Sequence, residues 1–327
     1  HHWAFLDRYD VLEHAAPGAI VLLASPYTAD KVWDALPLEF QNQAIEKHLR
    51  LFAIDAAAVA KRALMGSRIN TIMQTCFFAL SGIFPREEAI RHIKSAIAKT
   101  YKAKGQEVIE KNYAVVDEAL KHLHPVPTPA MTTTTRHRPP IVALAAPDFV
   151  QRVTSVILSN HGDALPVSAF PVDGTWPLGT AAWEKRNIAQ EVPVWDPEIC
   201  IQCNKCAMVC PHAAIRAKVY EPEHLASAPE TFKSTDWKTK DFAGAKFTIQ
   251  VAPEDCTGCK VCVSVCPAKD KSNPRHKAID MHPQAPLREP ERENYDFFLK
   301  LPNPDRTRIE RLDVKGSQLL LPLFEYS

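Results

Sequence analysis

Two short stretches of the chain carry eight of its nine cysteines in the same spacing. The first reads CIQCNKCAMVCP over residues 200–211, and the second reads CTGCKVCVSVCP over residues 256–267. Thiols separated by two residues can curl around one inorganic centre, so that three of them bind three irons of a [4Fe–4S] cluster. The fourth cysteine, followed by proline, binds the other cluster in two-cluster ferredoxins. The spacing therefore predicts two [4Fe–4S] clusters that exchange one ligand each.

This exchange assigns every one of the eight cysteines to a site. Because each motif lends its last thiol to the other cluster, we expect the two halves to fold as a pseudo-twofold pair in which neither half is stable alone. Zinc is the alternative metal, since it also takes four cysteines, although zinc modules usually contain separated C-x2-C pairs. The predicted first set is Cys200, Cys203, Cys206 and Cys266, and the predicted second set is Cys256, Cys259, Cys262 and Cys210.

The cysteine pattern also bears on the compartment and on the ninth thiol. Without a signal sequence, tightly spaced cysteines indicate metal binding rather than disulfides, so we expect a reducing, cytoplasmic environment. Cys76 stands apart in TIMQTCFFALSG, an apolar stretch that predicts a helix. Free cysteines in such stretches are commonly buried, so Cys76 is expected to be a structural thiol.

Composition and charge exclude several classes of function. The 327 residues are 46% hydrophobic and 24% charged, which does not indicate disorder. Lysine and arginine number 39 against 38 aspartates and glutamates, so no strong field would recruit nucleic acid or an anionic membrane. The longest apolar run, AIVLLA, is far short of the roughly 20 residues of a membrane helix. We expect a soluble chain, and its ends, HHWAFLDRYD and LPLFEYS, suggest a fragment.

Residues 1–123 alternate between short β-like runs and longer helical ones, the pattern of an α/β domain. AIVLLA (19–24) and LRLFAID (49–55) are predicted to be buried strands, each followed by a helix. Thr28 is a candidate N-cap, and Gly82 is a candidate stop for the helix that contains Cys76. Further helices are predicted at 56–64, between Pro85 and Gly105, and at 106–123.

Asn112 interrupts the apolar stripe of the last of these helices. A polar amide in such a position must find a hydrogen-bond partner. From the pattern alone, the favoured explanation is that Asn112 lies at the edge of the stripe and meets water. The alternative is that its amide contacts a ligand.

Residues 124–195 are predicted to be an extended, proline-rich linker at a domain boundary. Its opening, HPVPTPAMTTTTRHRPP, is rich in proline and threonine and cannot form a packed core. We interpret the basic trio Arg136, His137 and Arg138 as a solvated part of this linker. A short helix is expected around residues 147–159.

An α+β ferredoxin-like domain is predicted for residues 196–282. The distance between the two motifs exceeds the roughly 15 to 20 residues that two short strands and a turn require. We therefore interpret residues 220–247, which are polar and carry few strand signals, as an insertion that covers a neighbouring domain. The near balance of basic and acidic residues here favours an internal electron relay over a freely diffusing, acidic ferredoxin.

Longer stretches of the chain resemble one enzyme family from end to end. VWDPEICIQCNKCAMVCPHAAIR, FTIQVAPEDCTGCKVCVSVCP, GSRINTIMQTCFFALSG, LPVSAFPVDGTWPLGTAAWEKRNIA and VKGSQLLLPLFEYS closely resemble parts of pyruvate:ferredoxin (flavodoxin) oxidoreductases. Those enzymes are much longer, so the resemblance covers only their middle. It implies that 1–123 is the C-terminal part of an α/β gamma-type domain, that 196–282 is a bacterial ferredoxin-like domain, and that 283–327 leads into a thiamine-diphosphate domain.

The resemblance also implies an activity. Enzymes of this family decarboxylate pyruvate on thiamine diphosphate, pass electrons singly along three [4Fe–4S] clusters to ferredoxin or flavodoxin, and give the acetyl group to coenzyme A. The two clusters predicted here would be the medial and distal relay. Thiamine diphosphate, Mg and the third cluster are expected outside this chain, which would not be catalytic alone, and the complete enzyme is expected to be a homodimer.

Three residues are implied in binding coenzyme A. Asn70 in GSRIN and Asn112 in EKNYAVVD match family positions that contact the cofactor, and Arg68 is the implied phosphate partner. The resemblance thus favours the ligand explanation for Asn112, with its amide exposed toward coenzyme A. Two other functions stay open: a stand-alone two-cluster electron carrier fused to an α/β docking domain, and a structural zinc module.

Overall fold

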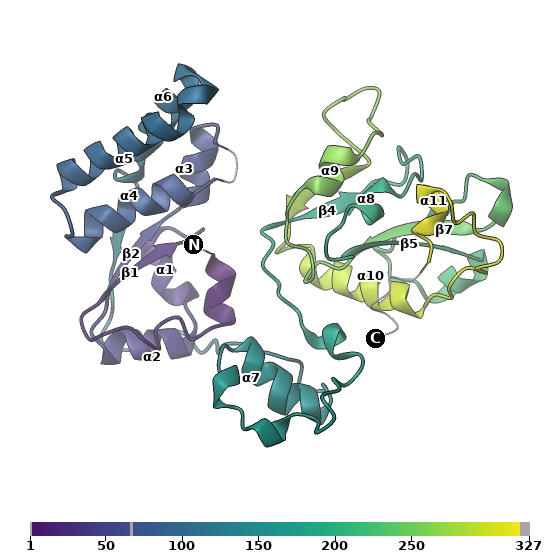
Figure 1. Ribbon diagram of the computed structural model, residues 1–327, viewed down its shortest axis with the longest axis horizontal. Helices are drawn as coiled ribbons and strands as arrows, with labels where there is room; N and C mark the ends of the chain where they lie inside the picture. The colour runs from purple at the N-terminus through teal and green to yellow at the C-terminus, as the bar shows by residue number, and fades with distance from the viewer. Residues whose placement is uncertain (1, 66–67, 321–327) are drawn as a thin grey trace. The chain divides into compact units, whose positions relative to one another are not determined.

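The computed structural model describes residues 2–65 and 68–320 (Figure 1). These residues form two compact units. The N-terminal unit contains the described residues up to 145 together with 151–167, and the C-terminal unit contains 146–150 together with the described residues from 168 onward. Within the described ranges, no helix is long and apolar enough to cross a membrane.

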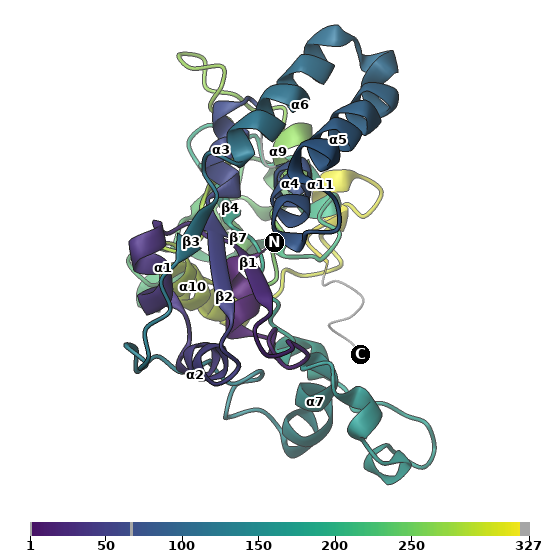
Figure 2. The same ribbon diagram turned by 90° about the vertical axis from the view of Figure 1, so that its left-hand side faces the viewer.

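A three-stranded sheet lies at the centre of the N-terminal unit (Figure 2). β1 (Ile20–Ala24) and β2 (Arg50–Ile54) pair in parallel, and both fall inside the runs predicted to be strands. β3 (His124–Val126) adds antiparallel to β2 at one edge. The sequence does not predict β3, because three residues centred on Pro125 give no strand pattern, although proline is tolerated in an edge strand.

Helices cover both faces of this sheet. Leu51 and Ala53 of β2 pack with Trp33 and Phe40 in one apolar cluster, whereas Ile54 belongs to a second cluster. Because side chains alternate along a strand, the two clusters lie on opposite faces, as in an α/β layer. The helices of this unit are α1 (Ala29–Ala35), α2 (Leu38–Glu46), α3 (Ala56–Arg62), α4 (Asn70–Ser81), α5 (Arg86–Tyr101), α6 (Gln106–Ala119) and α7 (Ser155–Leu158).

Several predicted local features are present in these helices. Gly82 ends α4 in the left-handed conformation, with φ 68°, which a side chain would disfavour. Thr28 precedes α1 but its side chain makes no capping hydrogen bond, whereas Asp55 caps α3 by accepting from the N–H of Ala58 at 2.8 Å. Cys76 is fully buried in α4, and this burial raises its pKa to about 11. The prediction of a structural thiol is confirmed.

The first part of the predicted linker packs on the N-terminal unit and is not a free spacer. The backbone N–H of Thr133 donates to Oε1 of the buried Gln41 at 2.9 Å. The interpretation of the basic trio as solvated holds for Arg136 and His137, which are exposed, whereas Arg138 is partly buried. Each member forms an ion pair, Arg136 with Asp7, His137 with Glu39 and Arg138 with Asp10.

Gln41→Leu is expected to lower the free energy of unfolding of the N-terminal unit by about 2 kcal/mol. Besides holding Thr133, the Gln41 amide donates to the carbonyl oxygen of Trp33 at 2.6 Å, and leucine would leave both backbone groups without this partner. Denaturant titration followed by tryptophan fluorescence would measure the loss. Gln106→Leu, on the exposed surface of α6, is the control, and an equal effect of the two changes would contradict the prediction.

The helix expected around 147–159 is present, since residues 148–158 are helical without a break, but its middle is wound differently. One π-helical turn over Val150–Thr154 is followed by α7. Beyond it, the chain continues through short 3₁₀ turns at Gly162–Ala164, Val167–Ala169 and Thr180–Trp183. Prolines separate these turns, which explains why no longer helix forms.

In the C-terminal unit, the strand before each cysteine motif pairs with the strand after the other motif. β4 (Glu191–Trp195) precedes the first motif and pairs antiparallel with β8 (Ile279–Pro283), which follows the second. β7 (Lys246–Val251) precedes the second motif and pairs antiparallel with β5 (Ile215–Tyr220), which follows the first. This exchange has the form of the expected pseudo-twofold pair. The helices are α8 (Lys205–Met208), α9 (Val261–Val265), α10 (Arg288–Lys300) and α11 (Val314–Ser317).

The insertion predicted at 220–247 packs on its own unit. A short strand, β6 (Thr235–Asp236), adds to the edge of β7. Trp237 and Phe242 are buried in the same apolar cluster as Cys200 and Cys206. These two aromatic side chains therefore anchor the segment beside the first cysteine motif.

α10 is held to the sheet by a buried lysine on β5. Lys218 is only 5% exposed, and its ammonium donates to the carbonyl oxygens of Phe298 (3.0 Å), Leu299 (3.4 Å) and Leu301 (2.6 Å). These carbonyls end α10, where the helix dipole favours a cation. The sequence does not predict this helix in the stretch 283–327, because Pro290 suggests a break, although proline is tolerated in a first turn.

A histidine bridges the strands β4 and β8 near their ends. The two ring nitrogens of His276 lie 2.8 Å from carboxylate oxygens of Asp196 and Asp280. Hydrogen bonds to these two carboxylates raise its pKa. The bridge therefore stabilises the unit fully below the unfolded-state pKa of about 6.5, and this stabilisation is lost as pH rises through the folded-state value.

We expect His276→Gln to remove a step in the pH dependence of stability above about pH 6.5. The unmodified protein should lose stability relative to the variant as pH is raised from 6 to 9, because only the unmodified protein then releases the bridging proton. Thermal unfolding at a series of pH values measures this difference. The same pH profile for both proteins would contradict the assignment.

Candidate iron–sulfur sites

The two cysteine motifs form loops with the same backbone conformation. In the first loop, Gln202 and Asn204 have φ values of 59° and 54°, and at the equivalent places in the second loop Gly258 and Lys260 have φ values of 69° and 65°. A left-handed residue on each side of the middle cysteine makes the loop reverse direction twice. Such a loop turns consecutive N–H groups toward its concave side, where they can face a negatively charged group.

An equivalent hydrogen bond to sulfur is present in each loop. The N–H of Gln202 donates to Sγ of Cys200 at 3.3 Å, and the N–H of Gly258 donates to Sγ of Cys256 at 3.4 Å. Peptide N–H groups directed at ligand sulfurs tune the potentials of iron–sulfur clusters. The loops are thus shaped to hold thiolates rather than merely to bury thiols.

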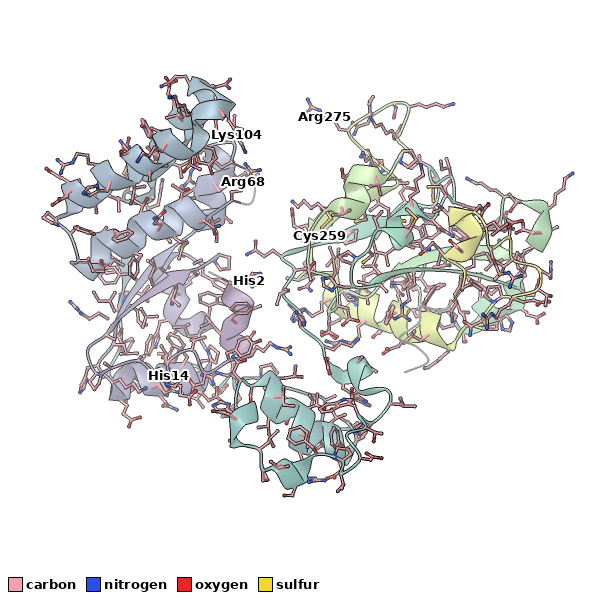
Figure 3. The ribbon with its side chains drawn as sticks, viewed as in Figure 1. His2, His14, Arg68, Lys104, Cys259 and Arg275 are labelled. Carbon is pink, nitrogen blue, oxygen red and sulfur yellow. The ribbon has the colours of Figure 1, made fainter. Side chains whose placement is uncertain are left out.

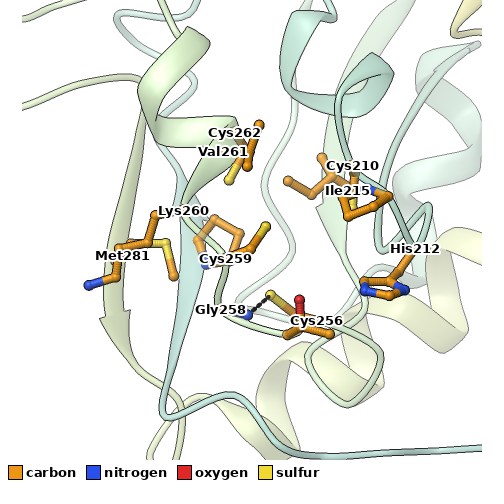
Figure 4. Close-up of a pocket in the computed structure, with 13 residues that line it drawn as sticks. Cys210, His212, Ile215, Cys256, Gly258, Cys259, Lys260, Val261, Cys262 and Met281 are labelled. Carbon is orange, nitrogen blue, oxygen red and sulfur yellow. Dashed lines mark hydrogen bonds between the residues drawn. The ribbon is translucent and has the colours of Figure 1, made fainter. Parts of the chain in front are cut away.

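The second site gathers cysteines from both motifs (Figure 4). Cys210, from the end of the first motif, lines the same pocket as Cys256, Cys259 and Cys262. In Figure 4 these four side chains border one common space, although Cys210 comes from the other side of the unit's pseudo-twofold arrangement. This is the set of four that the spacing predicts.

The first site shows the reciprocal grouping. Cys200, Cys206 and Cys266 are buried in one apolar cluster, which also contains Cys262 of the second site, so the electrostatic effects of the thiols on one another distinguish the two sites. Burial is the main reason that the pKa values of Cys200 and Cys206 are raised, and the charges of Cys203 and Cys266 add to the rise in both cases. Cys266, from the second motif, is thus an electrostatic neighbour of the first three thiols.

Cys262 of the second site has a raised pKa for the same two reasons, burial and the charges of neighbouring cysteines. The pKa of Cys262 is raised to about 12, mainly by burial and further by Cys256, Cys259 and Cys210. Four thiols at one place repel one another as thiolates, and bound iron cations would reverse this cost. Within the described ranges, no three Cys, His, Asp or Glu side chains surround a single ion position. In a cubane cluster the four ligands bind four different irons and lie farther apart.

Side chains beside the first loop hold it in place. The amide of Gln202, which is fully buried, donates to the carbonyl oxygen of Asp236 at 2.8 Å and accepts from the N–H of Lys238 at 2.9 Å. Asn204 donates to the carbonyl oxygen of Lys315 at 2.7 Å. The loop is therefore fixed by the insertion on one side and by α11 on the other. Sequence reasoning missed both contacts, since polar residues inside a cysteine motif carry no signal of their partners.

The three residues implied in coenzyme A binding lie in the N-terminal unit in different environments. Arg68 and Asn70, at the start of α4, are exposed, and Figure 3 shows Arg68 at the surface of the unit. Asn112 is only 1% exposed, so it neither meets water nor presents an exposed amide, and both expectations are corrected. α6 is buried against α4 and α5 on the side that carries Asn112.

Only one of the two polar groups of the Asn112 amide has a hydrogen-bond partner within the described ranges. Its Nδ2 donates to the carbonyl oxygen of Val108 at 2.7 Å, within its own helix. Among the described residues, nothing donates to its Oδ1, which is buried. A buried amide oxygen without a donor is rare in folded proteins and calls for an explanation.

Known proteins match this chain along its whole length. Residues 2–122 match the family described as pyruvate ferredoxin/flavodoxin oxidoreductase, and residues 199–269 match the 4Fe-4S dicluster domain. The chain is 56% identical to the pyruvate-flavodoxin oxidoreductase of Nostoc sp. and 50% identical to the probable pyruvate-flavodoxin oxidoreductase of Escherichia coli, in each case over 100% of this chain and 28% of that protein. It is also 43% identical to the pyruvate:ferredoxin oxidoreductase of Moorella thermoacetica, over 27% of that protein.

Over its whole length, the chain thus matches a part of pyruvate:ferredoxin (flavodoxin) oxidoreductases.

It spans less than a third of the length of these oxidoreductases, and it is part of such an enzyme. Within the family, the N-terminal match covers the α/β unit, and the dicluster match covers both cysteine motifs in a ferredoxin-like domain. Residues 135–189 match a domain of unknown function, so most of the predicted linker belongs to a sequence family of its own.

Proposed function

We propose that this chain is the electron-relay segment of a pyruvate:ferredoxin (flavodoxin) oxidoreductase and holds two [4Fe–4S] clusters. The observation that carries the proposal is the pocket shared by Cys210 with Cys256, Cys259 and Cys262. Three of these cysteines belong to the second motif and the fourth belongs to the first, so the site is complete only when both motifs contribute. The equivalent N–H···S bonds in the two loops support the same assignment.

The clusters, when bound, would accept and release one electron at a time without any change in covalent bonds. The chain's own residues would fix the clusters and set their potentials. Cys200, Cys203, Cys206 and Cys266 would hold the first, and Cys256, Cys259, Cys262 and Cys210 the second. Because all eight ligands belong to one small unit built on crossed strands, the two sites are held close enough for direct electron transfer between them.

The N-terminal unit is proposed to be the later part of a gamma-type domain that contributes to binding coenzyme A. The free Oδ1 of the buried Asn112 supports this role, because a donor group of the cofactor would satisfy it. Arg68 and Asn70 are exposed at the start of α4, where a phosphate and a polar group can reach them. Access to Asn112 would require a side chain over it to move, since the amide is covered.

The remaining parts of the proposal concern the complete enzyme. Thiamine diphosphate, Mg and a third [4Fe–4S] cluster would be held outside this chain, where pyruvate is decarboxylated. Ferredoxin or flavodoxin would take the electrons, and the complete enzyme would be a cytoplasmic homodimer. The similarity to a pyruvate-flavodoxin oxidoreductase and to a pyruvate:ferredoxin oxidoreductase supports pyruvate and flavodoxin or ferredoxin as the reactants.

An anaerobic iron and sulfide assay, with EPR of the dithionite-reduced protein, tests the relay. Two [4Fe–4S] clusters predict about eight irons and eight sulfides for this chain, with spin coupling between two neighbouring clusters. Zinc without sulfide would overturn the proposal.

Asn112→Ala in the full-length enzyme tests the coenzyme A contact. Loss of one hydrogen bond is expected to raise the KM for coenzyme A about tenfold while the iron content stays unchanged. Gln106→Ala, on the exposed side of the same helix, is the matched control. An unchanged KM in the Asn112 variant would remove this residue from the proposed site.

A further inference from the structure

The two halves of the C-terminal unit differ at one buried position beside the cysteine loops. Trp195 is the last residue of β4, and Val251 is the last residue of β7. Each lies five residues before the first cysteine of its motif, in VWDPEIC and QVAPEDC. The pseudo-twofold arrangement therefore puts an indole beside the first site at the place where the second site has an aliphatic side chain.

The Trp195 indole is buried next to the first site. The side chain is 3% exposed and belongs to the apolar cluster that also contains Cys200, Cys206, Cys262 and Cys266. Among the described residues, no group accepts a hydrogen bond from its buried Nε1. The thiol on which this indole acts is that of Cys200, whose pKa is raised by burial and lowered in part by the Trp195 side chain.

Trp237 in the same cluster shows what an ordinary buried indole does. Its Nε1 donates to Oδ1 of Asp241 at 2.8 Å, so its hydrogen-bonding capacity is satisfied by a carboxylate. Burying an N–H without a good acceptor is unfavourable, and Trp195 keeps such an N–H beside a sulfur. A thiol is a weak acceptor, whereas a thiolate that shares the charge of a cluster is a much better one.

We propose that the indole N–H of Trp195 donates to the cluster-bound thiolate of Cys200 and holds the reduction potential of the first site above that of the second. This inference rests on the proposed function, because it requires a cluster at the first site. Reduction adds negative charge to a cluster, and a hydrogen bond to its sulfur stabilises that charge. Val251 cannot make this bond at the second site. Trp195 thus raises the reduction potential of the first site, so that the electron resides preferentially on the first cluster.

A second difference between the halves acts in the same direction but more weakly. Asp255 precedes the first cysteine of the second motif, where the first motif has Ile199. The negative charge of Asp255 raises the pKa of Cys256, after the larger effect of burial. However, Asp255 forms an ion pair with Lys185 at 2.8 Å, which offsets much of its charge. The indole is therefore the clearer source of asymmetry.

Trp195→Phe in the full-length protein tests the proposal, because phenylalanine keeps a ring in the cluster and removes the N–H. EPR-monitored redox titration is expected to show a lower midpoint potential for the first cluster and an unchanged potential for the second. Trp237→Phe is the matched control and is expected to leave both potentials unchanged. A first-cluster potential in Trp195→Phe equal to that of the control would overturn the inference, while the presence of both clusters would leave the proposed function intact.

A second measurement needs no substitution at Trp195. Protein labelled with ¹⁵N in the indole nitrogen of tryptophan is expected to show a nitrogen coupling to the reduced first cluster by pulsed EPR, and the coupling should persist in Trp237→Phe. Absence of the coupling, with both clusters present, would overturn the inference. This result is distinct from a protein with no iron–sulfur signal at all, which would overturn the proposed function and the inference together.

Discussion

Cys266→Ala is expected to remove the cluster bound by the first motif and to leave the cluster bound by the second. Cys266 belongs to the second motif in sequence, yet its charge adds to the rise in the pKa values of Cys200 and Cys206. Loss of one of four thiolates opens an iron to solvent, so we expect the iron content to fall by about half.

Iron analysis together with EPR of the reduced variant measures this outcome. Cys76→Ala is the control, because Cys76 is a fully buried thiol of the N-terminal unit and should not bind iron. Cys210→Ala should give the mirror result, with the second cluster lost. Survival of the first cluster without Cys266 would refute the exchange of ligands between the motifs.

Lys218→Met is expected to lower the free energy of unfolding of the C-terminal unit by about 3 kcal/mol. Methionine keeps most of the apolar stem, which lies against the ring of Phe298 with the ammonium 5.1 Å from its centroid. It removes the donor that serves the carbonyl oxygens of Phe298, Leu299 and Leu301, and these groups would then lie unpaired at the end of α10.

Denaturant titration of the variant against the unmodified protein gives the size of this effect. Lys246→Met is the matched control on the neighbouring strand, since Lys246 forms a partly exposed ion pair with Asp236 at 2.7 Å. Such pairs contribute at most about 1 kcal/mol. If the two variants lost equal stability, the buried lysine would not hold α10 in the way inferred here.

Regular spacing made the grouping of the cysteines and the first strands predictable. The proposed ligand sets follow from the spacing of eight cysteines, and the structure brings Cys210 into the pocket lined by Cys256, Cys259 and Cys262, as that spacing predicts. AIVLLA and LRLFAID form β1 and β2, since short apolar runs followed by helical stretches have few alternatives in an α/β layer. Gly82 ends its helix because the left-handed conformation there suits glycine.

The features that the sequence did not reveal depend on contacts between distant segments. The acidic residues that the basic trio at 136–138 meets are known only from the fold, because they lie far from it along the chain. Asn112 is buried under neighbouring helices. The apolar pattern of a helix in the sequence does not show how much of the edge of its apolar face other helices cover. Trp237 and Phe242 anchor a polar insertion whose average composition hides them.

The proposed exchange of ligands, which the pocket shared by Cys210 and the second motif supports, also has a consequence for when the clusters would be assembled during protein synthesis. When only the first motif has emerged from the ribosome, four thiols are available. One of them, Cys210, belongs to the second site, whose other cysteines have not yet emerged. The first site in turn waits for Cys266, near the end of the second motif. Iron delivered early would therefore meet an incomplete ligand set, so cluster insertion should follow completion of both halves rather than proceed along the growing chain.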